Sequence, residues 1–261
     1  MQRISNMNKS FWKGKRVLVT GDTGFKGSWL SLILHMYGAT VQGISSSKFN
    51  DNAGLYSCLE LNKISNTIDC DIRDFDQVCK AFNSFNPEVV FHLAAQPLVR
   101  QSYQDPVTTY EVNVMGTMSI LEAVKKSLSV KSAVMVTTDK CYKNNEWEWG
   151  YRENDPMGGH DPYSSSKACA ELLTQSYQQS FFNDHANSPG VSTVRAGNVI
   201  GGGDFSEDRL IPDLYRAIST NNKLLLRNPL ATRPWQHVFE PISGYLKVAE
   251  RLFESGATDN D

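Results

Sequence analysis

A tyrosine and a lysine, Tyr163 and Lys167, stand four residues apart in the segment YSSSK. In a helix this spacing places both side chains on one face. A nearby cation lowers the pKa of a phenol, so that the tyrosine can accept a proton from an alcohol. The pair therefore predicts an acid–base centre for oxidation of a hydroxyl group, although the same spacing also occurs on ordinary solvated helix faces.

A second group of reactive side chains follows an apolar run at 132–137. Thr138, Asp139 and Lys140 bring a hydroxyl, an acid and an amine to the end of this run. If the run is a strand of a parallel sheet, its carboxyl end lies at the edge where such sheets place their chemistry. Adjacent charges usually form surface ion pairs, but this position favours a catalytic role.

A glycine-rich segment, GDTGFKG at 21–27, follows the first apolar run and precedes a helical pattern. Glycines at every third position allow a tight turn and a close approach of the backbone to a pyrophosphate, whose charge is met by N–H groups and by the helix dipole. A plain strand-to-helix turn is the alternative, which the order strand, loop, helix makes less favourable. We predict that a nicotinamide dinucleotide is bound by Gly21, Thr23, Gly24, Phe25, Lys26 and Gly27.

The sequence leaves the choice between NAD and NADP open. An acidic residue at the end of the second strand normally binds the ribose hydroxyls and repels a 2′-phosphate, but this chain has SSSK at 45–48. Asp71 and Ile72 follow the third strand and are placed to meet the adenine, while a helix cap is the alternative role for Asp71.

The elements that must position these residues alternate along the chain. Apolar, β-branched runs predict strands at 15–20, 40–44, 66–70, 87–93, 132–137 and 191–195, and helical spacing predicts helices at 29–37, 75–85, 106–126 and 163–181. Repeated β-α units close as a parallel sheet with helices on both faces, the doubly wound or Rossmann α/β architecture. After residue 195 the alternation weakens, with helical stretches near 209–220 and 242–253, so residues 1–195 are expected to bind the dinucleotide and 196–261 to form a smaller substrate-binding part within the same body.

The composition restricts the possible partners. The 261 residues carry a formal charge of −2, which argues against nucleic-acid binding. An apolar run of membrane-spanning length and a secretion signal are both lacking, so we expect a cytoplasmic protein. Five cysteines without metal-ligand spacing predict reduced thiols and no metal site, and we expect Cys141 to serve packing.

Taken together, these motifs resemble the extended short-chain dehydrogenase/reductase family, and within it the branch of CDP-glucose 4,6-dehydratases. The resemblance covers nearly the whole chain and rests on GDTGFKGSW (21–29), FHLAAQPLVR (91–100), NVMGT (113–117), TTDKCY (137–142), YSSSK (163–167), RAGNVIGGGD (195–204) and RPWQHVFEP (233–241). In the thymidine-linked dehydratases the strand-end pair is Asp-Glu, so Lys140 resembles the cytidine-linked branch. The resemblance also favours NAD over NADP and implies a role in deoxysugar biosynthesis, such as that of O-antigens.

The resemblance implies a role for each catalytic residue. Tyr163 would take the C4 hydroxyl proton of CDP-glucose or a related sugar nucleotide while hydride passes to NAD, with Thr138 bonded to the sugar or to the tyrosine. Lys140 would remove the C5 proton, which requires a desolvated lysine. Asp139 would protonate the departing C6 hydroxyl before hydride returns to C6.

The resemblance also implies further site residues and partners. Cofactor contacts are expected from Ala94, Ala95, Gln96 and Asn113, and substrate contacts from Asn198, Arg209, Arg233 and His237. Gln236 and His237 could equally line the pocket or pack it. His92 is expected to be structural or to lie at the cofactor edge. A homodimer is expected through long helices, including the one that carries Tyr163.

Proteins of this family continue well beyond the RPWQHV segment, whereas this chain ends at Asp261. We therefore expect an incomplete substrate-binding part, which threatens activity more than cofactor binding. A sugar-nucleotide 4-epimerase or 4-keto reductase, and an NAD-binding module without activity, are the alternatives; the Asp139-Lys140 pair favours elimination.

Overall fold

The predicted doubly wound parallel sheet is confirmed by the computed structural model, which describes residues 8–47, 54–183, 188–226 and 228–256; Lys48 and Asp261 lie outside them. The central sheet has the strand order β3-β2-β1-β4-β5-β6, and every neighbouring pair in it is parallel. Its strands are β1 Arg16–Thr20, β2 Thr40–Ser45, β3 Asn66–Asp69, β4 Val89–His92, β5 Ser132–Val136 and β6 Gly190–Val194.

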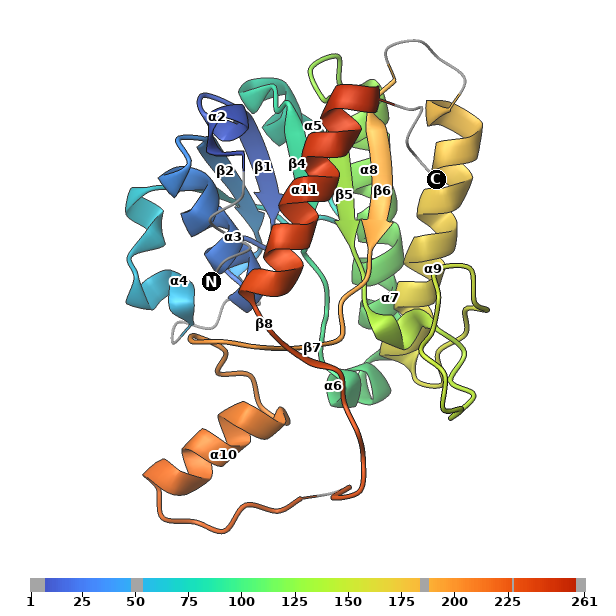
Figure 1. The fold of residues 1–261 in the computed structure, drawn as a ribbon. Coiled ribbons are helices and arrows are strands. Elements are labelled where there is room, and N and C mark those ends of the chain that lie inside the picture. The colour runs from blue at the N-terminus through green and yellow to red at the C-terminus, as the bar shows by residue number, and fades with distance from the viewer. Residues whose placement is uncertain (1–7, 48–53, 184–187, 227, 257–261) are drawn as a thin grey trace.

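Helices connect the strands and cover both faces of the sheet (Figure 1). The α-helices are α2 Lys9–Trp12, α3 Phe25–Met36, α4 Leu55–Cys58, α5 Phe75–Phe85, α6 Val99–Gln104, α7 Pro106–Tyr110, α8 Gly116–Lys126, α9 Pro162–Tyr177, α10 Leu210–Ser219 and α11 Phe239–Ser255. Shorter 3-10 and π segments are η2 Leu61–Lys63, η3 Glu111–Met115, η4 Asp139–Cys141 and η5 Gln178–Phe182. In the described part of the chain, none of these helices is long and apolar enough to cross a bilayer.

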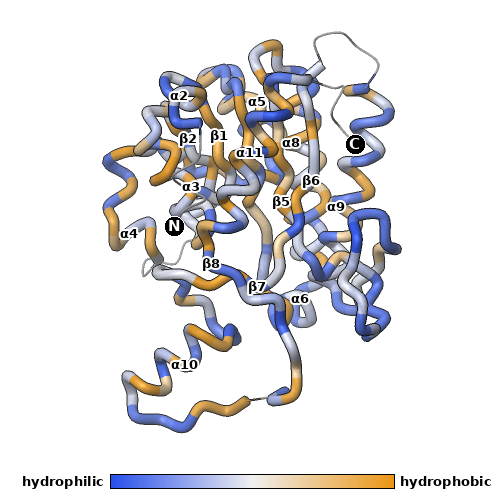
Figure 2. Tube along the Cα trace, viewed as in Figure 1, coloured by the Kyte–Doolittle hydropathy of each residue, from blue (hydrophilic) through white to orange (hydrophobic). Residues whose placement is uncertain are grey.

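Two apolar layers hold the helices against the sheet, which Figure 2 shows as hydrophobic segments in the interior. On one face, Leu30 and Leu34 of α3 and Leu246 of α11 pack with residues of β1 and β5. On the other face, Val78 of α5 and Ile120 of α8 pack with Leu18, Val90 and Met135. Burial on both faces explains why the strands appear in the sequence as continuous apolar runs.

The order of the sheet reverses at β1, which pairs with β2 on one side and with β4 on the other. Connections leave this switch point in opposite directions, so a crevice opens beyond the carboxyl ends of the two central strands. The glycine segment follows β1 and the TTDK segment follows β5. The topology therefore brings both motifs to one edge of the sheet.

The predicted helix at 106–126 is divided by a π segment, η3, into α7 and α8. A π segment inside an α-helix shifts side chains by part of a turn and often occurs at functional sites. Here it carries Asn113, whose side chain is buried and reaches both Gln96 and Ser166. Helical periodicity alone does not distinguish such a segment from regular helix.

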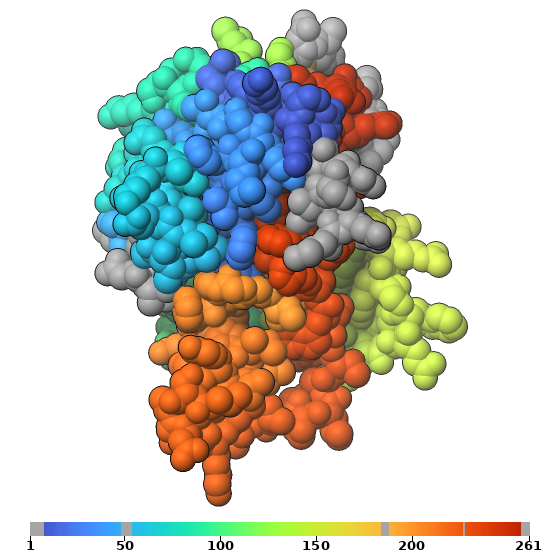
Figure 3. Space-filling view, turned by 60° about the vertical axis from the view of Figure 1, so that its left-hand side comes forward, coloured from blue at the N-terminus to red at the C-terminus, as the bar shows by residue number. Residues whose placement is uncertain are grey.

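The chain after β6 separates into two parts in space. The short parallel strands β7 Asn198–Ile200 and β8 Trp235–His237 pair with each other, and between them α10 and its flanking loops project from the body as a lobe (Figure 3). Helix α11 then returns to the sheet, where Tyr245 and Leu252 join the core. The two short strands are too brief to be predicted from periodicity.

Candidate active site

Tyr163 and Lys167 lie in the first turns of α9, as their spacing predicts. Asp161 caps this helix by accepting a hydrogen bond from the Ser164 backbone N–H at 2.9 Å, and Pro162 occupies the first turn, where a missing N–H costs nothing. The Lys167 ammonium donates to the carbonyl oxygen of Val136 at 3.3 Å, at the end of β5. Both side chains are buried beside the strand that leads to TTDK.

The chain's own residues raise the pKa of Tyr163 to about 12, chiefly because the phenol is buried. A hydrogen bond with Thr138 and the charge of Arg209 act in the opposite direction, while Asp139 adds to the increase. The protein groups alone therefore do not produce the lower tyrosine pKa, which is expected from a cation together with the charge of an oxidised nicotinamide. Burial outweighs the neighbouring cations, because the charged phenolate loses its hydration.

Two lysines approach the centre. Burial and the charge of Lys26 lower the pKa of Lys167 to about 8, while Glu171 raises it. Burial and the charge of Arg209 lower the pKa of Lys26 to about 8, opposed by Asp139. The Lys26 ammonium also lies 3.5 Å from the Tyr245 hydroxyl of α11. Lys26, expected among the cofactor contacts, thus also faces the catalytic residues.

The TTDK segment turns sharply after β5 into η4. The Thr138 hydroxyl donates to Asp139 Oδ1 at 3.1 Å and accepts the Lys140 backbone N–H at 3.4 Å. The Lys140 ammonium lies 6.0 Å from the centre of the Tyr163 ring. The prediction of a desolvated lysine is wrong in this structure, because Lys140 is exposed.

A buried ionic network, not predicted from the sequence, supports this turn. Glu171, one helical turn after Lys167, accepts bonds from Arg195 Nε and Nη2, each at 2.9 Å. The Thr137 and Thr193 hydroxyls donate to the same carboxylate. Burial raises the pKa of Glu171, but the bonds from Arg195 and from the two threonines outweigh it and lower the pKa. The network joins α9 to the ends of β5 and β6.

The glycine segment has the geometry that a dinucleotide requires. Gly21 has φ +72°, and a Cβ there would lie 2.8 Å from the Ala94 backbone nitrogen. Gly24 caps α3 without any side-chain hydrogen bond, so the first-turn N–H groups face outward for an anion. The segment therefore fits a pyrophosphate, with Thr23, Phe25 and Gly27 in the same turn.

The other expected cofactor residues line the same sheet edge, with different degrees of exposure. Ala94 and Ala95 are partly exposed at the end of β4. Asn113 is fully buried, and its amide bonds the Gln96 backbone N–H at 2.8 Å and the Ser166 hydroxyl at 2.9 Å. The structure thus places Asn113 behind the loop that carries Gln96.

Asp71 and Ile72 follow β3, as predicted. The Asp71 carboxylate receives Arg73 Nε at 3.0 Å and Nη2 at 2.6 Å, while Ile72 is buried. The helix cap is Asp74, which accepts the Gln77 backbone N–H at 3.1 Å. The alternative role of Asp71 as a cap is therefore wrong.

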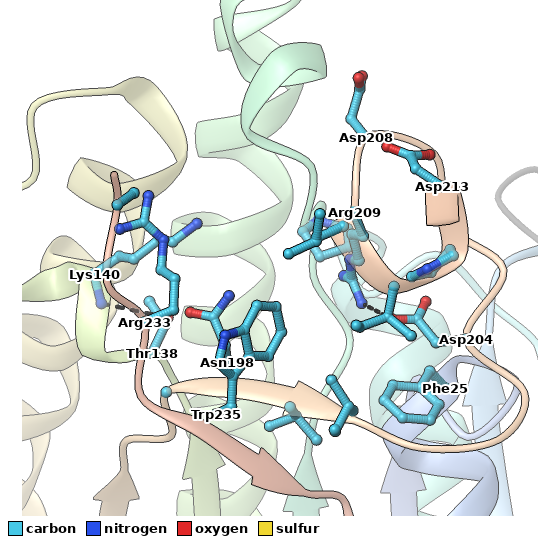
Figure 4. Close-up of a pocket in the computed structure, with 18 of the residues that line it drawn as sticks. Phe25, Thr138, Lys140, Asn198, Asp204, Asp208, Arg209, Asp213, Arg233 and Trp235 are labelled. Atoms are coloured by element: carbon cyan, nitrogen blue, oxygen red, sulfur yellow. Dashed lines mark hydrogen bonds and ion pairs between the residues drawn. The ribbon is translucent and has the colours of Figure 1, made fainter. Parts of the chain in front are cut away.

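A cavity of about 570 Å³ opens between the catalytic edge and the projecting lobe. Figure 4 shows Thr138 and Lys140 beside Arg233 on one side, Arg209 on the other, and Asn198 between them. Tyr163, Asp139 and Lys26 also line it. The TTDK turn, the tyrosine and the first turn of α3 thus face one space, whose size suits a sugar nucleotide.

The expected substrate residues differ in their positions. Arg209 donates to Asp204 at 2.8 Å, and Arg233 donates to the adjacent Thr232 carbonyl at 2.9 Å. His237, at the end of β8, instead accepts the Phe239 backbone N–H at 3.3 Å and packs edge-on against the Phe239 ring. Among the described residues that line the cavity, Asn198 and both arginines are present and His237 is not.

Two further titratable residues have structural roles. His92 lies between the Thr20 hydroxyl at 2.7 Å and the Thr117 hydroxyl at 3.0 Å, and burial lowers its pKa to about 3. Burial raises the pKa of the Cys141 thiol to about 12. A protonated thiol agrees with the packing role expected for Cys141, and a neutral, hydrogen-bonded histidine agrees with the structural alternative for His92.

The sequence profile of the GDP-mannose 4,6 dehydratase family matches residues 18–255, which includes every catalytic segment described above. The chain belongs to this family. Its expected place among the extended short-chain dehydrogenases/reductases is confirmed by this match and by structural relatives that include dehydratases and epimerases.

Individual members of the family give finer comparisons. The chain is 53% identical over 254 residues to the CDP-glucose 4,6-dehydratase of Salmonella typhimurium, covering 96% of this chain and 70% of that protein. It is 29% identical to the human dTDP-D-glucose 4,6-dehydratase, covering 91% of this chain and 66% of that protein. The structure of the Bacillus anthracis dTDP-glucose 4,6-dehydratase in complex with NAD aligns with a TM-score of 0.77 at 25% identity, covering 91% of this chain and 72% of that one.

Proposed function

We propose that this chain is an NAD-dependent nucleotide-sugar 4,6-dehydratase whose substrate is CDP-glucose. The observation that carries the proposal is the convergence of Tyr163, Thr138, Asp139 and Lys140 on one cavity beside the glycine segment of a dinucleotide fold. The 53% identity to a CDP-glucose 4,6-dehydratase supports both the reaction and the nucleotide.

The reaction begins at C4 of the sugar. Tyr163, as the phenolate, accepts the proton of the C4 hydroxyl. The Thr138 hydroxyl forms hydrogen bonds that hold the tyrosine oxygen and the sugar oxygen in place. A nicotinamide dinucleotide held at the glycine segment would supply the hydride acceptor for C4 and the hydride donor for C6. Lys167 supplies the ammonium that stabilises the phenolate, from its position 3.3 Å from the Val136 carbonyl.

Elimination of water follows at C5 and C6. The 4-keto group acidifies the C5 proton, which Lys140 accepts as a neutral amine, and Asp139 donates a proton to the departing C6 hydroxyl. Loss of water, addition of hydride at C6 and return of the proton from the Lys140 ammonium to C5 give CDP-4-keto-6-deoxyglucose without net oxidation. Because Lys140 is exposed, we infer that the sugar itself covers this side chain and excludes water from it.

The direct test is incubation of the chain with CDP-glucose and NAD, followed by mass and UV detection of a 4-keto-6-deoxy sugar. Lys140→Ala should oxidise C4 but retain the C6 hydroxyl, seen as reduced nicotinamide that accumulates on the enzyme, whereas Tyr163→Phe should suppress both steps. Cofactor binding without product from any nucleotide glucose would reject the dehydratase proposal for this chain, and elimination at the wild-type rate in Lys140→Ala would reject the assigned base.

We propose that the sugar nucleotide spans the cavity with its pyrophosphate near Arg233 and Arg209. Guanidinium groups donate paired hydrogen bonds to phosphate oxygens, and Asn198 stands between the two arginines (Figure 4). Residues 196–238 would then bind substrate, while α11 completes the core beneath the site.

We further propose a homodimer formed through α7 and α9. Val107 and Tyr110 of α7 and Leu172 of α9 are exposed apolar side chains on helices that pack together. Burial of such a patch against a second copy would remove apolar area from water. Light scattering coupled to gel filtration should give twice the chain mass, and Leu172→Glu should give a monomer.

A further inference from the structure

The serine run after β2 leaves the selection of NAD without its usual acid, and a carboxylate from the glycine segment occupies the adjacent space. Asp22 is fully buried. Its Oδ1 accepts a hydrogen bond from the Ser45 hydroxyl at 2.8 Å, and its Oδ2 accepts one from the Thr67 hydroxyl. One side chain of the cofactor loop thus joins Ser45 at the end of β2 to Thr67 near the start of β3.

Strand β2 leaves space for the Asp22 carboxylate at Gly43. A Cβ at Gly43 would lie 1.9 Å from Asp22 Oδ2, so only glycine leaves space for the acid. Gly43 pairs with Thr67 across the sheet, and Ser45 stands two residues further along β2 on the same face. The acid is therefore built into the sheet and is not a flexible surface group.

The hydrogen bonds also fix what Ser45 can offer a ligand. Its hydroxyl proton points to Asp22, and its oxygen receives the Thr23 backbone N–H at 3.4 Å. The remaining lone pair of the oxygen can accept a bond from a ribose hydroxyl, which is a donor. Burial raises the pKa of Asp22, while the hydrogen bonds from Thr67 and Ser45 favour its carboxylate form. A 2′-phosphate dianion offers no proton, and it would meet a lone pair backed by that carboxylate.

We propose that Asp22, acting through Ser45, makes this chain select NAD over NADP in place of an acid at the end of β2. The position of Ser45 matches that of the acid that normally binds the ribose 2′-hydroxyl. The inference rests on the proposed function only in that the glycine segment holds a nicotinamide dinucleotide; the dehydratase chemistry does not enter it.

The test is a comparison of NADH and NADPH binding, read from nicotinamide fluorescence on chain freed of endogenous cofactor. The wild type should prefer NADH by at least about tenfold. Asp22→Asn keeps the shape and one acceptor but removes the charge, and it should reduce that preference by about tenfold, mainly through tighter NADPH binding.

Three further variants separate the possible causes. Asp69→Asn tests the rival acid at the end of β3, which accepts the Ser47 backbone N–H at 2.8 Å, and should leave the preference unchanged. Thr67→Val removes a hydrogen bond to Asp22 but leaves the charge of the Asp22 carboxylate, and it should keep the preference for NADH. Ser45→Ala, which keeps Asp22 and tests the inference even if Asp22→Asn does not fold, should weaken NADH severalfold without weakening NADPH, so that the preference for NADH falls.

An unchanged ratio in Asp22→Asn with intact thermal melting, or a loss of preference in Asp69→Asn alone, would overturn the inference. If the wild type binds both dinucleotides equally, the inference about Asp22 fails, but product formation from CDP-glucose would still support the proposed function. If neither dinucleotide binds, both the inference and the proposed function fail.

Discussion

Removal of the Glu171 carboxylate should destabilise the whole chain and not only the site. The Arg195 side chain is 15% exposed and Glu171 is 2% exposed, so Glu171→Ala leaves a largely buried guanidinium without its partner. Breaking a buried ion pair from one side costs about 3–5 kcal/mol. The Thr137 and Thr193 hydroxyls lose their acceptor as well, at about 1 kcal/mol each. Part of that cost is already included in the free energy given for breaking the ion pair.

We therefore expect Glu171→Ala to lower the free energy of unfolding by about 4 kcal/mol, a large part of the stability of an ordinary domain. Urea unfolding followed by far-UV circular dichroism measures this change directly. Arg195→Met should be similarly destabilising, whereas the double variant Glu171→Met/Arg195→Met should lose much less than the sum, because no unpaired charge remains.

The reasoning would be refuted by a loss below about 1 kcal/mol in Glu171→Ala, the range of an exposed pair, or by additive losses in the double variant. The pH dependence gives an independent check. The folded-state pKa of Glu171 is lowered, so its contribution is present above its unfolded pKa and disappears as the pH falls through the lower folded value. The stability difference between wild type and Glu171→Gln should narrow over the same acidic range.

Three other predictions follow from the same contacts. Lys26→Met should raise the pKa of Lys167 from its value of about 8, because a like charge is removed, and should move the alkaline limb of the kcat/KM profile to higher pH, whereas Lys26→Arg should leave it in place. The folded-state pKa of Lys26 is about 8, against an ordinary 10.5. The free-energy penalty of burying its charge is therefore fully present below pH 8 and decreases as the pH rises toward 10.5. The stability that Lys26→Met gains, measured by urea unfolding, should decrease over the same range. Arg233→Ala should raise KM for the sugar nucleotide about tenfold with little change in kcat, and a comparable fall in kcat with unchanged KM would contradict the assignment to ground-state binding.

The sequence predicts those features that depend on local pattern. Strand burial on both faces makes the runs before Gly21 and Thr138 continuous and apolar, so the sheet and its catalytic edge follow from the order of elements. The four-residue spacing of Tyr163 and Lys167 holds because Pro162 and Asp161 begin the helix just before them. These predictions needed no information about distant contacts.

Other features depend on contacts between distant segments, which periodicity does not contain. Arg195 meets Glu171 only because β6 lies beside β5, and the π segment that carries Asn113 looks like ordinary helix in its apolar spacing. The desolvation expected for Lys140 failed for a related reason: η4 leaves this residue exposed at the open cavity after Thr138 ends the buried strand. Position at a sheet edge fixes where a residue stands but not how deeply its side chain is buried.

The raised pKa of Tyr163 bears on its protonation state in the chain without ligands. The phenol stays protonated because burial costs the phenolate its hydration. Two cations at the site are already held in place, Lys167 by the Val136 carbonyl and Arg209 by Asp204. An oxidised nicotinamide would add one more positive charge, and the C4 hydroxyl would add a hydrogen bond to the phenolate; each favours the charged form. Under the proposed function, cofactor and sugar would therefore both favour the phenolate that Tyr163 needs to act as a base.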